Sequence, residues 1–301
     1  MPREIYTLDL EFRGAPHVIA SYLIPTSKGA VLIESGPGST TGKLEAGLKR
    51  LGFGLSDITD VFLTHIHLDH AGAAGWLARQ GARIHVHPKG APHLLDPKKL
   101  LESATRIYGD AMDALWGEFL PVAESQLVVE SDGAKITVGD LELLAIETPG
   151  HADHHFAYVV EDLCFAGDVA GVRLPGSDYV SVPTPPPEFH LGKWRDTLTK
   201  LRTLEIRRIA PTHFGIFESP AKHLEMLATG LDALAKFIEE VMPGNPLPEE
   251  ISQRYQEWMN EQYALHHVGG DELNAYEFAS PWWMSPGGIQ RYWRKYCLNP
   301  S

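Results

Sequence analysis

Short apolar runs alternate with stretches of helical spacing over the first two thirds of the chain. The runs rich in β-branched, leucine and aromatic residues, which is typical of buried strands, lie at 17–24, 30–35, 60–65, 83–88, 135–138, 141–149, 155–161, 163–167 and 206–213. Apolar residues three or four positions apart predict helices at 43–52, 69–80 and 189–201. Strands with interspersed helices indicate sheets covered by helices, so we expect an α+β fold.

The strand pattern stops near residue 217, and the spacing of the apolar residues then becomes helical. One apolar stripe, with steps of three and four, consists of Leu224, Leu227, Leu231 and Leu234. It predicts an amphipathic helix over 220–242, and a second helix over 249–263 follows the proline-rich stretch "PGNPLP". We therefore expect a domain over 1–217 and a helical extension over 218–301. The stripe packs on its own domain or on a second copy of the chain in a homodimer.

Composition and charge narrow the class of protein. The 301-residue chain is 44% hydrophobic and has a formal net charge of −13, which argues against a general affinity for nucleic acid. No apolar run approaches the length of a membrane span, and the first residues are too acidic for a signal peptide. Cys164 and Cys297 form no C-x-x-C pair, which fits a reducing compartment. We expect a soluble, cytoplasmic protein without membrane or nucleic-acid partners.

Ligand-type side chains are concentrated in the stretch "FLTHIHLDHAG" at 62–72. They are His65, His67, Asp69 and His70. Neutral imidazoles and carboxylates bind divalent ions of the zinc type. His65 and His67 lie two apart in an extended segment and can share one metal, whereas Asp69 and His70 follow the turn and can face a second metal. Because a helix cap with incidental histidines would not need this spacing, we favour a metal site.

Further ligand-type residues each follow an apolar run. They are His151 in "TPGH", Asp168 in "AGD" and His213 in "THFG". Loops at strand ends are where a rigid scaffold holds converging side chains, and a carboxylate such as Asp168 can bridge two cations. The residues therefore predict a site for two divalent ions. Zinc is the default, and iron or manganese also suits His/Asp sites.

The order of these motifs resembles the metallo-β-lactamase superfamily, in its glyoxalase II and lactonase sector. The resemblance covers residues 15–217 and implies a four-layer αββα sandwich with the site at one edge between the two sheets. The ligand sets that it implies are His65, His67 and His151 for one metal, Asp69, His70 and His213 for the other, and Asp168 as the bridge. It does not name the substrate.

The resemblance also implies residues that support the ligands without binding metal. Where the family's first motif usually ends in Asp, this chain has Glu34, and a longer carboxylate is expected to change how the ligand loop is held. His155 corresponds to a second histidine in glyoxalase-type "TPGH" segments and is expected in the same supporting role.

The substrate pocket is expected to include residues outside the motifs. Acyl-homoserine lactonases have a tyrosine shortly after the bridging aspartate, but this chain has none there, and Tyr179 is the candidate to replace it. The helical extension resembles the pocket-forming C-terminal region of glyoxalase II in position. We therefore expect Trp258 and Trp283 to wall the pocket, with simple packing or dimerisation as the alternative role of the extension.

The remaining histidines show no ligand pattern. His85 and His87 form an H-x-H pair without a nearby partner in sequence and are expected to occupy ordinary strand and loop positions. Those expected to face solvent or to form local hydrogen bonds are His190, His223, His266 and His267.

The function expected from these residues is metal-dependent hydrolysis of a small molecule. A hydroxide that bridges two metals would attack an ester, thioester or lactone carbonyl, with one metal stabilising the oxyanion. Asp69 would orient the hydroxide and transfer its proton to the leaving group. A phosphodiesterase or ribonuclease of the same fold is the first alternative, and an iron-dependent sulfur dioxygenase is the second.

Overall fold

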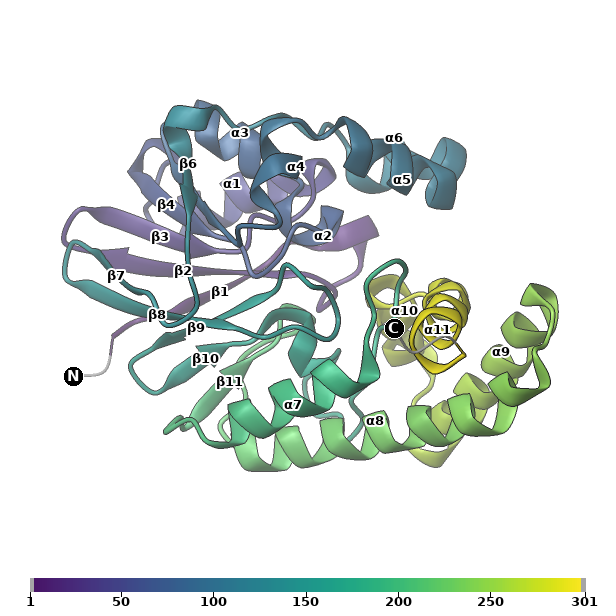
Figure 1. The fold of residues 1–301 in the computed structure, drawn as a ribbon. Coiled ribbons are helices and arrows are strands. Elements are labelled where there is room, and N and C mark those ends of the chain that lie inside the picture. The colour runs from purple at the N-terminus through teal and green to yellow at the C-terminus, as the bar shows by residue number, and fades with distance from the viewer. Residues whose placement is uncertain (1–2, 299–301) are drawn as a thin grey trace.

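Two β-sheets pack face to face at the centre of the computed structural model, which describes residues 3–298 (Figure 1). The first sheet has, in spatial order, β1 (Tyr6–Asp9), β2 (Ala20–Thr26), β3 (Gly29–Ile33), β4 (Ile58–Phe62), β5 (Arg83–Val86) and β6 (Leu127–Val129). The second has β11 (Arg208–Ala210), β10 (Leu163–Phe165), β9 (Phe156–Val160), β8 (Leu141–Glu147) and β7 (Lys135–Val138). Strands β3 to β6 run parallel, as do β10 and β11, and the other neighbours are antiparallel.

Alternate strand positions supply the core between the sheets. In β2, Tyr22 and Ile24 face the second sheet, whereas Leu23 between them packs on the opposite side with the helices. The ring of Tyr22 lies 5.1 Å from that of Phe165 in β10, across the interface between the sheets. Because both sheets bury one full face here, their register is fixed and the ends of their strands meet at a shared edge.

Helices cover the outer face of each sheet, which confirms the expected four-layer αββα sandwich (Figure 1). The helices on the side of the first sheet are α1 (Thr41–Arg50), α2 (Leu68–Ala71), α3 (Ala74–Arg79), α4 (Ala91–Leu95), α5 (Lys98–Tyr108) and α6 (Met112–Trp116). Those on the side of the second sheet are α7 (Leu191–Arg202) and α8 (Pro220–Val241). The chain then continues through α9 (Pro248–Leu265), α10 (Gly270–Ala279) and α11 (Ser285–Tyr292). No helix within residues 3–298 combines the length and the apolar character needed to cross a membrane.

The structure corrects one predicted helix. Residues 69–80 form two short helices, α2 and α3, instead of one continuous helix. At the junction, a Cβ on Gly72 would lie 2.7 Å from Cα of Pro37 and 2.9 Å from the backbone nitrogen of Gly38. The loop after β3 therefore packs directly on the backbone at Gly72, which apolar spacing alone did not reveal. Each predicted strand run contains a strand, whereas β1 and β6 were not predicted.

The apolar stripe of α8 is buried within the chain. Its members, each at most 3% exposed, are Leu224, Leu227, Leu231 and Leu234. They share a hydrophobic cluster with Trp194 and Leu198 of α7, so the expectation that this stripe packs on its own domain is confirmed. The second predicted helix is also present, as α9. Helices α10 and α11 were not predicted, because their apolar spacing is irregular.

Truncating the stripe should destabilise the fold. Leu231 has no exposed surface, so Leu231→Ala should lower the free energy of unfolding by about 3 kcal/mol, through lost burial and the cavity left behind. Leu265→Ala is the matched control, because that side chain is 67% exposed and should change the free energy by less than about 0.5 kcal/mol. Urea denaturation of both variants checks this, and equal losses would contradict the assigned packing.

Candidate metal centre

The ligand-type residues predicted from the sequence meet at one edge between the two sheets. The loop after β4 supplies His65 and His67, and α2 supplies the next pair of residues. The loop from β8 to β9 contributes His151, the turn after β10 contributes Asp168, and the segment after β11 contributes His213. These loops leave the strand ends of both sheets, so the sandwich itself brings together residues almost 150 positions apart in sequence.

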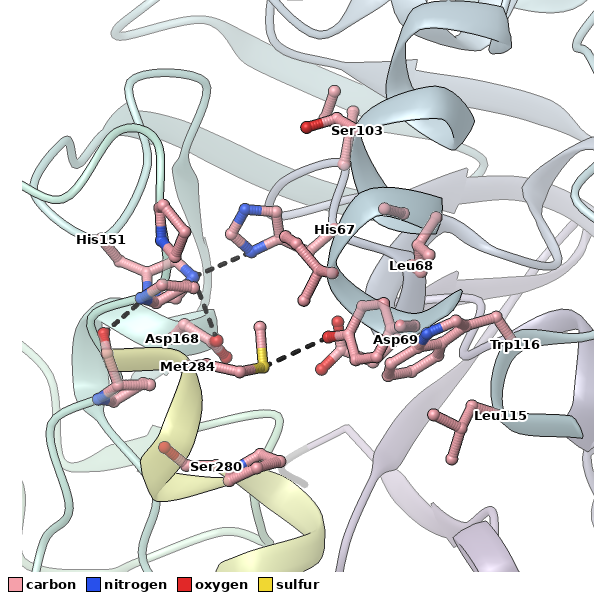
Figure 2. A pocket seen from close by; sticks show the side chains of 18 of the residues that line it. His67, Leu68, Asp69, Ser103, Leu115, Trp116, His151, Asp168, Ser280 and Met284 are labelled. Carbon is pink, nitrogen blue, oxygen red and sulfur yellow. Dashed lines mark hydrogen bonds and ion pairs between the residues drawn. The ribbon is translucent and has the colours of Figure 1, made fainter. Parts of the chain in front are cut away.

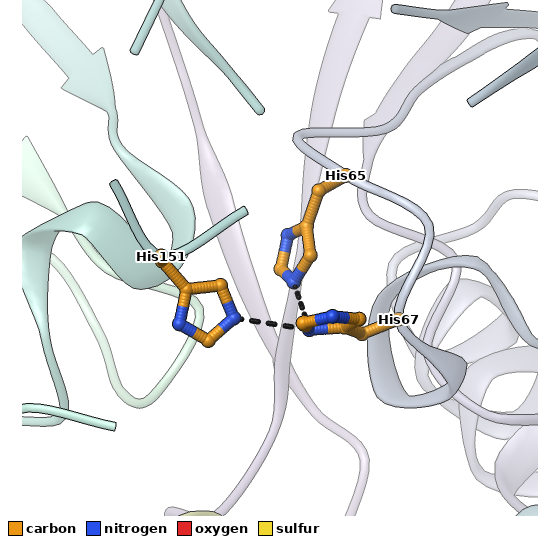
Figure 3. Close-up of side chains that lie close together, drawn as sticks. All are labelled: His65, His67 and His151. Carbon is orange, nitrogen blue, oxygen red and sulfur yellow. Dashed lines mark hydrogen bonds between the residues drawn. The ribbon is translucent and has the colours of Figure 1, made fainter. Parts of the chain in front are cut away.

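Three imidazoles form the first cluster (Figure 3). His65 Nε2 lies 2.9 Å from His67 Nδ1, and His151 Nε2 lies 3.0 Å from the same His67 atom. One ring nitrogen carries either one hydrogen or one lone pair, so His67 Nδ1 cannot fully satisfy both neighbours. Converging nitrogen lone pairs are satisfied by a cation.

The second cluster combines a carboxylate with two imidazoles. Asp69 Oδ2 lies 3.4 Å from His213 Nε2 and 3.6 Å from His70 Nε2. The ligand atoms of each cluster all lie within 4.8 Å of one another. Asp69 keeps 18% of its side chain exposed, whereas both imidazoles are buried, so this carboxylate is the member that reaches open space.

Asp168 lies between the two clusters. Its Oδ2 lies 3.3 Å from His151 Nε2, while its Oδ1 lies 3.2 Å from His70 Nε2 and 3.5 Å from His213 Nε2. Each carboxylate oxygen therefore faces a different cluster. A Cβ on the preceding residue, Gly167, would lie 2.6 Å from the His155 ring, so the close approach of this turn requires glycine.

Outer hydrogen bonds orient the imidazoles. His151 Nδ1 donates to the Pro183 carbonyl (3.1 Å), and His213 Nδ1 donates to the Val18 carbonyl (2.6 Å). A carbonyl oxygen can only accept, so Nδ1 of each ring carries the hydrogen and Nε2 presents a lone pair to the centre. His70 Nδ1 similarly faces the Glu34 carboxylate at 3.1 Å.

The carboxylate of Glu34 connects several ligand loops. It accepts hydrogen bonds from the hydroxyl of Thr64, the Thr64 amide (3.3 Å), His70 Nδ1 (3.1 Å) and the Thr212 hydroxyl (3.1 Å). Thr64 precedes the ligand His65 and Thr212 precedes His213, so one buried side chain supports loops from both sheets. Glu34 has a φ of 68°, a conformation that costs a non-glycine residue free energy and occurs mainly at functional sites.

The buried charges also fit a cation. Burial, with smaller contributions from His70 and His67, holds the pKa of His65 well below its usual value. Burial favours protonation of Asp168, but nearby imidazoles, led by that of His70, outweigh it and hold the pKa of Asp168 well below its usual range. Burial opposes protonation of His70 and His213, but nearby carboxylates, led by Asp168, outweigh it and raise the pKa of both rings. Since a metal requires neutral imidazoles and ionised carboxylates, its binding would displace the protons of these two rings.

Several ligand atoms lack a hydrogen-bond partner within residues 3–298. These buried atoms include His70 Nε2, Asp168 Oδ1 and His213 Nε2. Unsatisfied buried polar atoms are costly, and here they converge on the same small volume. With their imidazole and carboxylate donors, the residues of each cluster fit the binding of a metal ion, and Asp168 lies between the two clusters.

His155 and His154 lie next to the ligands. The ring of His155 stacks 5.0 Å from that of His65, and its Nδ1 pairs with the Thr148 hydroxyl at 2.8 Å, so it lies beside the cluster as expected of a supporting residue. His154 lines the cavity, and its Nε2 lies 3.3 Å from Glu188. Sequence reasoning assigned no role to His154, although its place three residues after a ligand could have indicated one.

A cavity of about 480 Å³ opens onto the metal centre (Figure 2). Its lining includes the ligands His67, Asp69, His151 and Asp168, the α6 residues Leu115 and Trp116, and the tail residues Ser280, Trp283 and Met284. Part of the helical extension therefore lines the cavity. Trp116, Met284 and Tyr108 were missed because nothing in their local spacing separates pocket positions from packing positions.

Two residues expected in the pocket lie elsewhere. Neither Tyr179 nor Trp258 is among the residues that line the cavity. Tyr179 of the main domain packs against Tyr263 and Tyr276 of the tail, whereas Trp258 packs against Phe237 within the tail. Of the three aromatic residues proposed for the pocket, Trp283 alone lines it.

Histidines outside the centre have other partners. His85 lies 2.7 Å from both Asp60 and Glu130, and these carboxylates raise its pKa against the opposing effect of burial. His85 is in none of the metal-type clusters found in residues 3–298, as expected. His223 does not face solvent. It is fully buried, and its Nε2 donates to the Ala170 carbonyl at 2.8 Å, because α8 packs over the turn that carries Asp168.

Sequence comparison identifies the family to which this fold and this candidate centre belong. The pattern of the metallo-beta-lactamase superfamily matches residues 14–213, and the chain belongs to this superfamily. A metallo-beta-lactamase family protein from Thermus thermophilus has a similar fold, with a TM-score of 0.70 and 21% identity over 96% of this chain and 93% of that one.

Curated relatives found by sequence are 27% to 32% identical to this chain. A metallo-beta-lactamase fold-containing protein from Sulfurisphaera tokodaii is 28% identical over 67% of this chain and 74% of its own. An atrochrysone carboxyl ACP thioesterase from Aspergillus fumigatus is 27% identical over 66% and 51%, and a hydroxyacylglutathione hydrolase from Rhodopseudomonas palustris is 32% identical over 42% and 38%. This chain thus spans about half or less of these two hydrolases.

Replacing the connecting carboxylate should weaken metal binding. In the Glu34→Gln variant, a neutral amide replaces the carboxylate that accepts these hydrogen bonds in the native protein. His70 and the two ligand loops therefore lose support. We expect metal affinity to fall by about 10- to 100-fold. Glu130→Gln is the matched control, because it removes a buried carboxylate from His85 and should leave metal affinity unchanged. Competition with a chromophoric chelator measures both, and equal affinities would contradict the role of Glu34.

Proposed function

We propose that the protein is a dinuclear metal-dependent hydrolase, with thioesters as its first substrate class and esters and lactones as related ones. The observation that carries this proposal is the position of Asp168, whose two oxygens face imidazoles of different clusters. Such an arrangement suits two cations that share one carboxylate. We propose zinc for both, because tetrahedral His-rich sites favour it. The free thiols of Cys164 and Cys297 fit a reducing compartment such as the cytoplasm.

The metals, when bound, would lower the pKa of a water molecule and polarise a carbonyl group. The chain itself holds and orients the reactants. Asp69 reaches the cavity while His213 holds its Oδ2, so its carboxylate can accept a hydrogen bond from the attacking water and direct it. The apolar lining around the centre excludes bulk water and strengthens each electrostatic contact within it.

The cavity and the relatives favour a carbonyl substrate over a phosphodiester. The lining near the centre includes Leu68, Leu115, Trp116 and Met284, which suit an acyl group. Two of the named relatives are a thioesterase and a hydroxyacylglutathione hydrolase, and both names denote thioester cleavage. The net charge of −13 disfavours a nucleic-acid substrate. The proposed partner is therefore a small-molecule thioester.

Substrate preference tests this proposal. The metal-loaded protein should hydrolyse an acyl thioester with a higher kcat/KM than bis(p-nitrophenyl) phosphate, and a chelator should abolish both activities. Steady-state kinetics with a thiol-trapping reagent measures the first reaction, and nitrophenolate absorbance measures the second. Preference for the phosphodiester would favour the alternative of the same fold, and chelator-resistant turnover would exclude a metal-dependent reaction.

Removing the bridging charge tests the dinuclear arrangement. Asp168→Asn keeps the shape of the side chain but removes its charge, so the metal content should fall below two ions per chain and thioester turnover should be lost. Circular dichroism should show an intact fold. Asp178→Asn is the control, because Asp178 is exposed and pairs with Lys222 at 2.6 Å. Elemental analysis measures the metal, and an Asp168→Asn variant with two ions and full activity would remove Asp168 from the centre.

A further inference from the structure

One face of α5 lines the cavity and changes character along its length. The positions on this face, with steps of one, three and four, are Lys99, Leu100, Ser103, Ala104, Ile107 and Tyr108. Lys99 and Tyr108 are nine residues apart, which corresponds to roughly 14 Å at 1.5 Å per residue. The cavity wall thus has a cationic end at Lys99 and an apolar end at Tyr108.

The apolar end closes against the helical tail. The Tyr108 hydroxyl donates to Met284 Sδ at 3.2 Å, and the Tyr108 ring lies 5.9 Å from that of Trp283. Burial raises the pKa of Tyr108, and the charge of Asp69, which lines the same cavity, adds to this effect. Leu115 and further tail residues complete an apolar chamber at this end.

The cationic end carries charges that the chain does not neutralise. Lys89, His93 and Lys99 all line the cavity from the side of α4 and α5. Both lysines are exposed, and neither ammonium group forms an ion pair or hydrogen bond with another residue in the described part of the chain. Arg13 lines the same cavity, with its guanidinium 4.3 Å above the Phe278 ring. The chain as a whole has a net charge of −13, so this group of cations is opposite in sign to the overall charge.

The acidic residues of the cavity outside the metal centre already have partners. Glu188 Oε2 accepts from the Asp153 amide at 2.9 Å and lies 3.3 Å from His154 Nε2. Glu277 Oε1 accepts from the Tyr263 hydroxyl at 3.1 Å. These partners are neutral groups, so neither carboxylate pairs with a lysine. Within the described residues the cavity therefore offers two unpaired ammonium groups at one end and apolar surface at the other, which is complementary to an amphipathic anion.

We propose that the substrate is an amphipathic anion, with its apolar part in the chamber formed by α5, α6 and the tail and its carboxylate or phosphate at Lys89 and Lys99. The inference rests on the proposed function for the identity of the reacting group, a thioester or ester carbonyl that reaches the metal centre. Beyond the proposed function, the inference specifies the charge of the substrate and the side of the cavity that binds the charged group. His93 lies between the two lysines in sequence and contributes a further hydrogen-bond donor.

Binding measurements on the metal-loaded protein test the anion site without any need for turnover. Octanol, octanoate and octyl phosphate share one apolar chain, and isothermal titration calorimetry gives their dissociation constants. At least one anion should bind more tightly than octanol, and the stronger anion identifies the headgroup as carboxylate or phosphate. Each of Lys89→Gln and Lys99→Gln should reduce this preference by roughly fivefold, and salt should weaken it.

Lys98→Gln is the matched control, because Lys98 is exposed on the same helix but does not line the cavity. It should leave the preference unchanged, and metal content should be equal in all variants. Octanol binding as tightly as both anions, or an anion preference that persists in the double lysine variant, would overturn the inference even if thioesters are hydrolysed. Lysine-dependent anion binding without ester, thioester or lactone turnover would instead overturn the proposed function and support the anion site.

Discussion

The buried carboxylate of Glu34 is the contact on which the geometry of the centre depends. It lies after β3 and accepts hydrogen bonds from the loop after β4, from α2 and from the segment after β11. These segments belong to different sheets, so their relative position would otherwise rest on packing alone. A buried carboxylate without donors would be strongly destabilising, which makes the three loops and Glu34 mutually dependent. Glu34, which is longer than the Asp usual at this place in the family pattern, has a φ of 68°.

The sandwich explains why the metal ligands converge. Two sheets that bury one face against each other bring their strand ends to a common edge, and each ligand follows such an end. Backbone carbonyls of Pro183 and Val18 then fix the orientation of the imidazoles. The ligand positions therefore follow from the core between the sheets, and their protonation follows from the hydrogen bonds around them.

The helical tail forms part of the cavity wall beside the candidate metal centre. Its first helix packs on α7, while α10 and the segment before α11 reach the cavity opposite α5 and α6 (Figure 1). The metal ligands are the general part of the site, since they come from the region that matches the superfamily. The chamber and its cationic end come from α4 to α6 and from the tail. Helices α4 to α6 lie within the matched region, between the ligand-type residues His70 and His151, whereas the tail lies outside it.

The sequence by itself determined the α+β class and the ligand-type residues, because strand runs, H-x-H-x-D-H spacing and residues after strand ends are local patterns. The αββα sandwich came from the resemblance of these motifs to the superfamily. It did not reveal the break at Gly72, the buried place of His223 or the pairing of His85 with two carboxylates, since each depends on segments distant in the chain. Tyr108 and Trp283 meet at the cavity, whereas Tyr179 packs from the main domain against the tail and Trp258 packs within the tail. Aromatic residues have the same local signature in a pocket and in a core, so only tertiary packing decides between these positions.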